Sequence, residues 1–208
     1  MHGMKSGPLQ SIVILCMFVL SGCTAPVEVI SPPVESTAAE PLPTFLSFSA
    51  STLERTVDQG DQHDLRNSFE GPILLIWVAA GCNGCHDWTD MVREGLQNGS
   101  IDNSTNIVSV HRYAEFESKE SVMNVYGDNN SSHYAPWPVL MPTPSTRVIN
   151  ASSGRMTDFG LYEAFDNPVT PTIQVIDEAG RLAWTSKHYW ANSTVLDEAL
   201  NIMEGGGE

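Results

Sequence analysis

The chain has 208 residues, of which 41% are hydrophobic and 17% are charged, so it can form one ordinary hydrophobic core. Its formal net charge is −15, from 25 acidic and 10 basic side chains. A surface with this excess of carboxylates repels phosphate backbones, and nucleic acid is therefore excluded from the partners we expect.

The N-terminus has the pattern of an export signal. Lys5 supplies a positive charge, and an apolar run extends from Leu9 to Leu20, so we expect residues 1–22 to be a signal peptide. The tetrapeptide Leu-Ser-Gly-Cys that ends at Cys23 resembles the lipobox of prokaryotic lipoproteins. This resemblance implies cleavage before Cys23 and lipidation of its thiol.

An uncleaved anchor helix and simple secretion are the alternatives to lipidation. The apolar run is short against the roughly 17–25 residues that span a bilayer. All three alternatives place the rest of the chain on the extracytoplasmic side, and the lipid anchor would hold it at the cell membrane. Residues 23–44 contain five prolines and no basic residue, which predicts a flexible Pro/Ser/Thr-rich stalk before a domain over residues 45–208.

The domain begins with two candidate strands, Phe45–Phe48 and Leu53–Val57. Residues Ile73–Ala80 are all apolar, without the alternation of a half-exposed strand, and this indicates a strand buried on both faces. From Asn83 to Gln97, apolar side chains recur at helical spacing and predict a helix. A strand expected over Ile107–Val110 completes a right-handed βαβ unit.

The second half of the chain is patterned less clearly. Residues 117–126 have a weak helical pattern, and Tyr134–Leu140 can form a buried strand. Thr172–Asp177 and Arg181–Trp184 are expected to pair as a hairpin. The chain ends in an amphipathic helix, for which Thr194 is the expected N-cap.

Cysteine placement is the strongest chemical signal. Cys16 lies in the signal segment and Cys23 at the lipobox, which leaves Cys82 and Cys85. A disulfide between these two closes too small a ring to gain much stability, so the pair is placed for chemistry. It stands where a buried strand gives way to a helix, whose N-terminal N–H groups and dipole stabilise a thiolate. We therefore predict that Cys82 is the nucleophile and Cys85 the resolving thiol.

Two stretches, Gly71–Cys85 and Asn167–Arg181, together resemble the thioredoxin superfamily and in particular its extracytoplasmic TlpA- and ResA-like branch. The resemblance implies an α/β, thioredoxin-like fold with a mixed central sheet flanked by helices. It also implies that the Thr170–Pro171 bond is cis, in a substrate-binding loop that faces the cysteines.

The same resemblance implies an activity. The protein would be a thiol-disulfide oxidoreductase that needs no cofactor and exchanges dithiol for disulfide with exported cysteine-containing proteins. The family branch favours reduction of these clients, and a membrane redox partner would recharge the cysteine pair.

The sequence also departs from the family pattern. Ile76 stands where thioredoxins carry a buried carboxylate, Gly81 replaces a common tryptophan, and the residues between the cysteines are Asn-Gly. An insertion over residues 112–165 separates the Cys-x-x-Cys unit from the proline loop. These departures leave the redox potential and the direction of reaction open.

Two alternative functions use the same residues. The stretch from Cys82 to His86 also spells Cys-x-x-Cys-His, the attachment signature of c-type haem. Cys82, Cys85 and His86 could instead hold a metal ion, although a second pair of ligands is missing. Within the redox interpretation, His86 either tunes the thiolates or is a partly exposed helix residue. Trp137 belongs either to the core or to a peptide groove.

Overall fold

The computed structural model describes residues 41–205. The expected signal peptide, Cys23 and all but the last residues of the expected stalk lie outside this range. Within residues 41–205, the chain forms no helix that is long and apolar enough to cross a bilayer.

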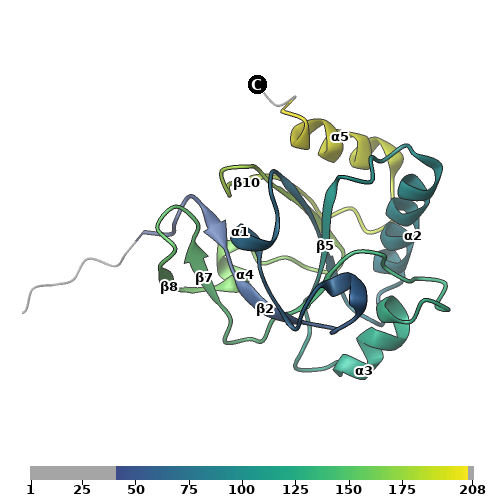
Figure 1. Cartoon of the computed structure of the whole chain (residues 1–208), viewed down its shortest axis with the longest axis horizontal. Helices are drawn as coiled ribbons and strands as arrows, with labels where there is room; N and C mark the ends of the chain where they lie inside the picture. Colours follow the sequence, from purple (N-terminus) through teal and green to yellow (C-terminus); the bar gives the residue numbers. More distant parts are fainter. Residues whose placement is uncertain (1–40, 206–208) are drawn as a thin grey trace, which may run out of the picture. The chain divides into compact units, whose positions relative to one another are not determined.

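A mixed sheet of seven strands lies at the centre, in the order β10-β9-β4-β5-β6-β2-β3 (Figure 1). Strand β4 runs parallel to β5, and β5 to β6, whereas β9 and β2 join the sheet antiparallel to their neighbours. The expected α/β, thioredoxin-like fold class is confirmed. The strands are β2 (Ser49–Thr52), β3 (Gln62–Asp64), β4 (Ile73–Val78), β5 (Asn106–His111), β6 (Val139–Met141), β9 (Thr172–Ile176) and β10 (Leu182–Ser186).

Short and long helices flank this sheet. The helices expected over Asn83–Gln97 and 117–126 are both present, the second as α3 followed by a π-helical turn. The helical elements are η1 (Thr56–Asp58), α1 (Leu65–Ser68), α2 (Asn83–Asn98), α3 (Lys119–Val122), η2 (Met123–Gly127), α4 (Leu161–Ala164) and α5 (Ser193–Met203).

Strand β4 is buried along its whole length, as its continuous apolar run predicts. Its alternate side chains from Leu74 to Val78 face a hydrophobic cluster that also contains Trp88 of α2 and residues of α5. The side chains from Ile73 to Trp77 face a second cluster, beneath α1 and α4. Burial on both faces therefore fixes β4 at the centre of the sheet, since each fully buried large apolar side chain contributes about 1.5–3 kcal/mol.

One of the two strands expected at the start of the domain is wrong. Leu53–Val57 is not a strand, because Glu54 adopts a φ of 62° and the 3-10 turn η1 begins at Thr56. Leu53 supplies the apolar signal as a core residue, but the side chain of Asp58 accepts from the backbone N–H of Arg55 at 2.9 Å and folds the segment into the turn. The strand lies just before this segment, as β2.

A second sheet, in the order β1-β7-β8, is built from β1 (Leu46–Ser47), β7 (Arg147–Asn150) and β8 (Met156–Gly160). It lies at the left of Figure 1, on the side of the domain opposite to α2 and α3. The strand expected over Phe45–Phe48 is thus shorter and pairs outside the central sheet. The strand expected over Tyr134–Leu140 forms only at its end, as β6.

The C-terminal helix is capped two residues earlier than expected. Asn192, not Thr194, is the N-cap of α5, and its side-chain oxygen accepts a hydrogen bond from the backbone N–H of Val195 at 3.2 Å. Thr194 already lies inside the helix. The hairpin expected from β9 and β10 is confirmed.

Candidate redox site

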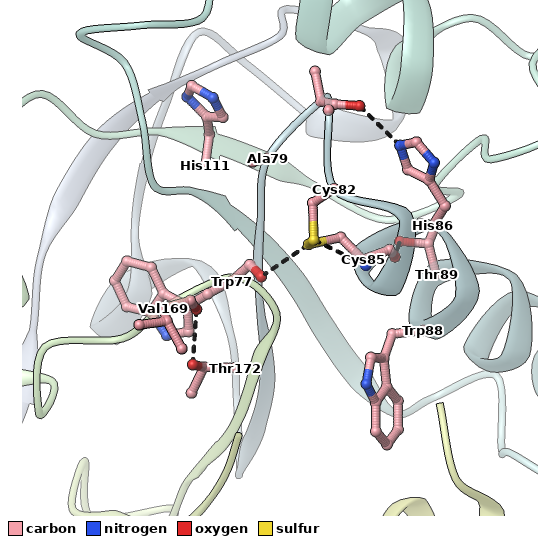
Figure 2. The surroundings of a disulfide bond; sticks show 12 residues. Trp77, Ala79, Cys82, Cys85, His86, Trp88, Thr89, His111, Val169 and Thr172 are labelled. Atoms are coloured by element: carbon pink, nitrogen blue, oxygen red, sulfur yellow. Dashed lines mark hydrogen bonds between the residues drawn. A yellow bond between two sulfur atoms is a disulfide. The ribbon is translucent and has the colours of Figure 1, made fainter. Parts of the chain in front are cut away.

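The cysteine pair lies in the turn between β4 and α2 (Figure 2). Cys82 is the N-cap of α2, and its Sγ accepts a hydrogen bond from the backbone N–H of Cys85 at 3.1 Å. The two cysteines form a disulfide, with Cα atoms 5.2 Å apart. Cys82 is 8% exposed, whereas Cys85 is fully buried. A reaction partner can therefore reach the pair only at the edge of Cys82.

The proline loop lies against the first turn of α2. The Thr170–Pro171 bond is cis, as the family resemblance implies. A Cβ atom at Gly84 would lie 3.2 Å from Cδ of Pro171 and 2.2 Å from the carbonyl oxygen of Tyr189. Only glycine permits this approach, so the Asn-Gly dipeptide between the cysteines lets two loops close on the redox turn.

The carboxylate of Glu117 binds the same turn from the other side. It accepts hydrogen bonds from the backbone N–H groups of Ala80 at 2.6 Å and Gly81 at 2.9 Å. Its oxygen Oε2 also lies 2.9 Å from Nε2 of His111, a fully buried side chain at the end of β5. Within residues 41–205, Nδ1 of His111 has no hydrogen-bond partner. The neutral ring protonated on Nε2 fits both observations, because it donates to Glu117 and leaves no buried N–H unpaired.

The pKa values of this pair favour an ionised carboxylate beside a neutral imidazole. Burial alone would raise the pKa of Glu117, but the hydrogen bonds from Gly81, Ala80 and His111 outweigh burial and hold that pKa below its usual range. Burial also lowers the pKa of His111, against the opposing effect of its hydrogen bond to Glu117.

Glu117 and His111 were not among the residues predicted from the sequence. Glu117 lies 36 residues after Gly81, in a segment without a recognisable motif. One signal could have indicated Glu117. The carboxyl ends of neighbouring parallel strands share an edge of the sheet. The loop with Glu117 follows β5 as the cysteine turn follows the parallel strand β4, so the two are expected to lie close together.

His86 faces away from the sulfur atoms and towards the loop before the cysteines. Its Nε2 lies 2.8 Å from the carbonyl oxygen of Ala80, and its ring stacks on that of His133 with centroids 4.2 Å apart. His133 in turn pairs with Asp90 at 2.8 Å. Burial lowers the pKa of His86, so at neutral pH it carries no charge that would stabilise a thiolate.

The alternative metal and haem sites lack support in the geometry. Among residues 41–205, no three side chains of His, Cys, Asp or Glu are grouped so that they could hold a metal ion. The disulfide between Cys82 and Cys85 engages both thiols that haem attachment would use.

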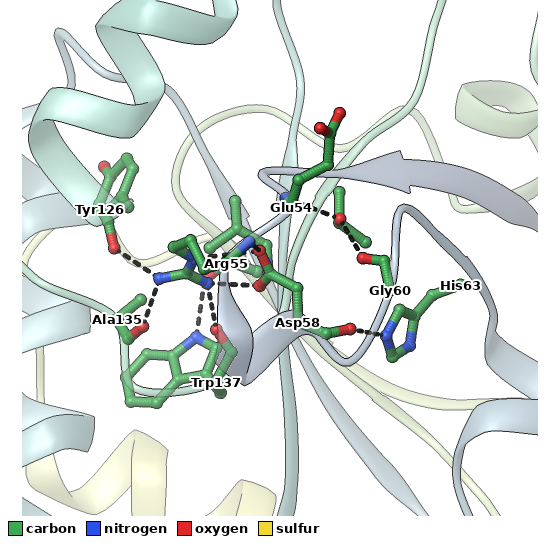
Figure 3. Close-up of polar contacts among 11 residues, drawn as sticks. Glu54, Arg55, Asp58, Gly60, His63, Tyr126, Ala135 and Trp137 are labelled. Carbon is green, nitrogen blue, oxygen red and sulfur yellow. Dashed lines mark hydrogen bonds and ion pairs between the residues drawn. The ribbon is translucent and has the colours of Figure 1, made fainter. Parts of the chain in front are cut away.

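The largely buried side chain of Arg55 links the start of the domain to the segment that contains Tyr126 and Trp137 (Figure 3). Arg55 pairs with the fully buried Asp58 at 2.6 Å and donates hydrogen bonds to the carbonyl oxygens of Tyr126, Ala135 and Trp137. The hydroxyl of Tyr126 then donates to the carbonyl oxygen of Ala79, just before the cysteine turn, at 2.8 Å.

Trp137 belongs to the core rather than to a peptide groove. It is 4% exposed, and its indole N–H donates to Oγ of Ser109 at 2.9 Å.

Arg112 holds the proline loop. Its Nε donates to the carbonyl oxygen of Pro168 at 3.0 Å, and its guanidinium lies 3.6 Å from the ring centre of Tyr162. The segment from His111 to Glu117 therefore contacts both the cysteine turn and the chain that leads into Pro171.

Exposed apolar side chains lie on three loops that contact the cysteine turn, and we call this set the apolar rim. Phe116 adjoins Glu117, and Val169 precedes the cis bond. The Tyr189–Trp190 pair follows β10, and the carbonyl oxygen of Tyr189 lies against Gly84. Their exposed fractions are 83% for Phe116, 49% for Val169, 47% for Tyr189 and 62% for Trp190. In the described chain, the other exposed large apolar side chains are Leu42 and Met156.

The central sheet, the Cys-x-x-Cys pair at a helix N-terminus and the cis proline beside it define a thioredoxin-like fold. No protein-family model and no curated protein matches the chain. A thiol:disulfide interchange protein of the thioredoxin family from Chlorobium tepidum TLS is similar over 80% of this chain and 99% of that chain, with a TM-score of 0.51 and 18% identity. StoA from Bacillus subtilis is similar over 77% of this chain and 99% of that chain, with a TM-score of 0.50 and 15% identity. At these identities the likeness shows the fold.

Proposed function

We propose that the protein is a membrane-anchored extracytoplasmic thiol-disulfide oxidoreductase that reduces disulfides in exported proteins. The observation that carries this proposal is the Cys82–Cys85 disulfide at the N-terminus of α2, with Cys82 slightly exposed, Cys85 fully buried and the cis Pro171 packed against Gly84 between them. An attacking thiol at a helix N-terminus, followed by a buried resolving thiol, is the arrangement that thiol-disulfide exchange needs.

The reaction balances as two exchange steps. The thiolate of Cys82 attacks one sulfur of a client disulfide, forms a mixed disulfide, and releases the other client sulfur as a thiolate that takes up a proton. Cys85 then loses its proton and attacks the sulfur of Cys82, which releases the second client thiol. The client gains two electrons, and the Cys82–Cys85 disulfide is left for reduction by a dithiol on a membrane partner.

The remaining parts of the proposal rest on the surroundings of the pair. The apolar rim gives an exported client an apolar surface around Cys82, which suits an extended segment of an incompletely folded protein. The lipobox pattern at Cys23 supports attachment to the cell membrane. Reduction is the direction that the TlpA- and ResA-like resemblance implies.

A redox titration of the full chain against glutathione and dithiothreitol tests the activity, with tryptophan fluorescence as the readout. We expect a reversible two-electron transition near about −270 mV, whereas a transition near about −120 mV would make the protein an oxidant. Cys82→Ser should abolish turnover of a disulfide substrate, and Cys85→Ser should trap mixed disulfides. The absence of any reversible transition would overturn the proposed function.

Membrane attachment is tested by fractionating cells that express the chain or its Cys23→Ser variant. We expect the parent protein in the membrane fraction and the variant in the soluble extracytoplasmic fraction, with the same redox transition. Equal distribution of the two proteins would exclude the lipid anchor.

A further inference from the structure

The carboxylate of Glu117 binds the backbone of the turn that carries the attacking sulfur. It binds the N–H groups of Ala80 and Gly81, the two residues directly before Cys82. The carboxylate therefore occupies both of these backbone donors. The Sγ atom of Cys82 keeps the N–H of Cys85 as its hydrogen-bond donor.

The charge of this carboxylate is not cancelled by its partner. His111 is neutral near pH 7, because burial disfavours its charged form and its Nδ1 has no acceptor among residues 41–205. The other ionisable side chains around the turn are His86 and Asp90 of α2, His133 in the loop after η2, and Tyr126 of η2.

A thiolate on Cys82 would therefore form one residue along the chain from a backbone N–H group that an ionised carboxylate binds. Like charges at close range disfavour ionisation, so the carboxylate raises the free energy of the thiolate without a matching effect on the uncharged disulfide. Destabilising the reduced form in this way makes a dithiol give up its electrons more readily, whereas a stabilised thiolate makes an oxidant.

We propose that Glu117 is a positioning residue that sets the reducing strength of the Cys82–Cys85 pair through its charge; this inference rests on the proposed redox function and specifies its direction. The carboxylate supplies a negative charge beside the cysteine turn, which the apolar Ile76 cannot supply. It acts on Cys82, and it makes no bond to the reacting sulfur atoms.

The test compares the full chain with its Glu117→Gln variant, which keeps the size of the side chain and removes its charge. In the reduced proteins, the pKa of Cys82 is read from the pH dependence of alkylation by iodoacetamide. We expect this pKa to be lower in Glu117→Gln. The equilibrium constant for oxidation by glutathione disulfide should also fall, by at most about tenfold for each unit of difference, and the fall should be larger at pH 9 than at pH 7, because the effect grows with the thiolate population.

Two further variants separate charge from structure. Glu115→Gln removes a charge from an exposed position in the same loop and should leave the pKa of Cys82 unchanged. Glu117→Asp keeps the charge on a side chain that is one methylene shorter, so its pKa for Cys82 should lie between the parent and Glu117→Gln values. This variant also serves if Glu117→Gln does not fold.

The inference would be overturned if the pKa of Cys82 stayed at the parent value in both Glu117 variants and only the melting temperature fell. Glu117 would then only stabilise the structure of the turn. A raised pKa in Glu117→Gln would overturn it as well. The thiol pKa is measured in the reduced protein without any client, so this result is independent of whether the parent chain shows a reversible redox transition.

Discussion

At the scale of single residues, Gly84 decides whether the proline loop can close on the cysteine turn. Alanine in place of glycine inside a helix is normally stabilising by about 1 kcal/mol. At Gly84 the added Cβ would lie 2.2 Å from the carbonyl oxygen of Tyr189, which is backbone and cannot move aside as a flexible side chain does. We expect Gly84→Ala to lower the free energy of unfolding by about 1–3 kcal/mol and to slow disulfide exchange.

Gly81→Ala is the matched control in the same turn. A Cβ at Gly81 would meet only Oε1 of Glu117, at an ordinary 3.5 Å. Urea unfolding should therefore show a large loss for Gly84→Ala and a change within about 0.5 kcal/mol for Gly81→Ala. Equal losses of unfolding free energy in the two variants would mean that the close contact with Tyr189 does not require glycine at position 84.

At the scale of elements, the N-cap of α5 differs from the residue that the sequence predicts. Asn192 accepts a hydrogen bond from the N–H of Val195, whereas Thr194 is an exposed residue in the first turn. We expect Asn192→Ala to lower the free energy of unfolding by about 1 kcal/mol. Thr194→Ala should change the free energy of unfolding by a few tenths of a kcal/mol at most. Both values are measured by chemical denaturation, and a larger loss for Thr194→Ala than for Asn192→Ala would restore Thr194 as the N-cap.

Elements with a strong pattern were predictable from the sequence, and those fixed by distant partners were not. Strand β4 and helix α2 follow from an apolar run and from helical spacing, which are local properties. The segment Leu53–Val57 carries the same apolar signal as a strand. Its path is set instead by Arg55, whose guanidinium binds carbonyl groups 71 to 82 residues away along the chain. No local pattern contains that information.

The site divides in the same way. Cys82, Cys85 and Pro171 were found because each lies in a short motif, and the cis bond at Pro171 was expected from the resemblance. Glu117 and His111 have no motif, since only the packing of β5 beside β4 brings them to the cysteine turn. Of the two interpretations of His86, the charged tuning group is not favoured, because burial lowers its pKa.

At the scale of the whole molecule, one buried and one half-buried histidine should make folding sensitive to acid. His86 and His111 have lowered pKa values, with burial as the main cause in both. The unfolded chain therefore binds protons more strongly below a pH of about 6.5, the ordinary pKa of histidine. Stability is fully present above that pH and falls as the pH is lowered towards the folded-state pKa values.

Thermal unfolding between pH 7.5 and pH 5 measures this effect. We expect the melting temperature to fall across this range, and His111→Asn to flatten the fall even if it lowers stability at every pH. Below about pH 4.5, protonation of Glu117 should add a further loss, because its folded-state pKa is also lowered and the unfolded chain takes up the proton first. A melting temperature that rises on acidification from pH 7.5 to pH 5 would contradict the assignment of neutral histidines.

The segment between Arg112 and Glu117 has a consequence for changes in chain length. Arg112 is bonded to Pro168 and Glu117 to the N–H groups of Ala80 and Gly81, so residues 113–116 span two fixed anchor points. An insertion or deletion within this span would shift one anchor relative to the other and misalign the proline loop with the cysteines. Anyone transplanting this redox turn into another scaffold should therefore carry the span across at its original length.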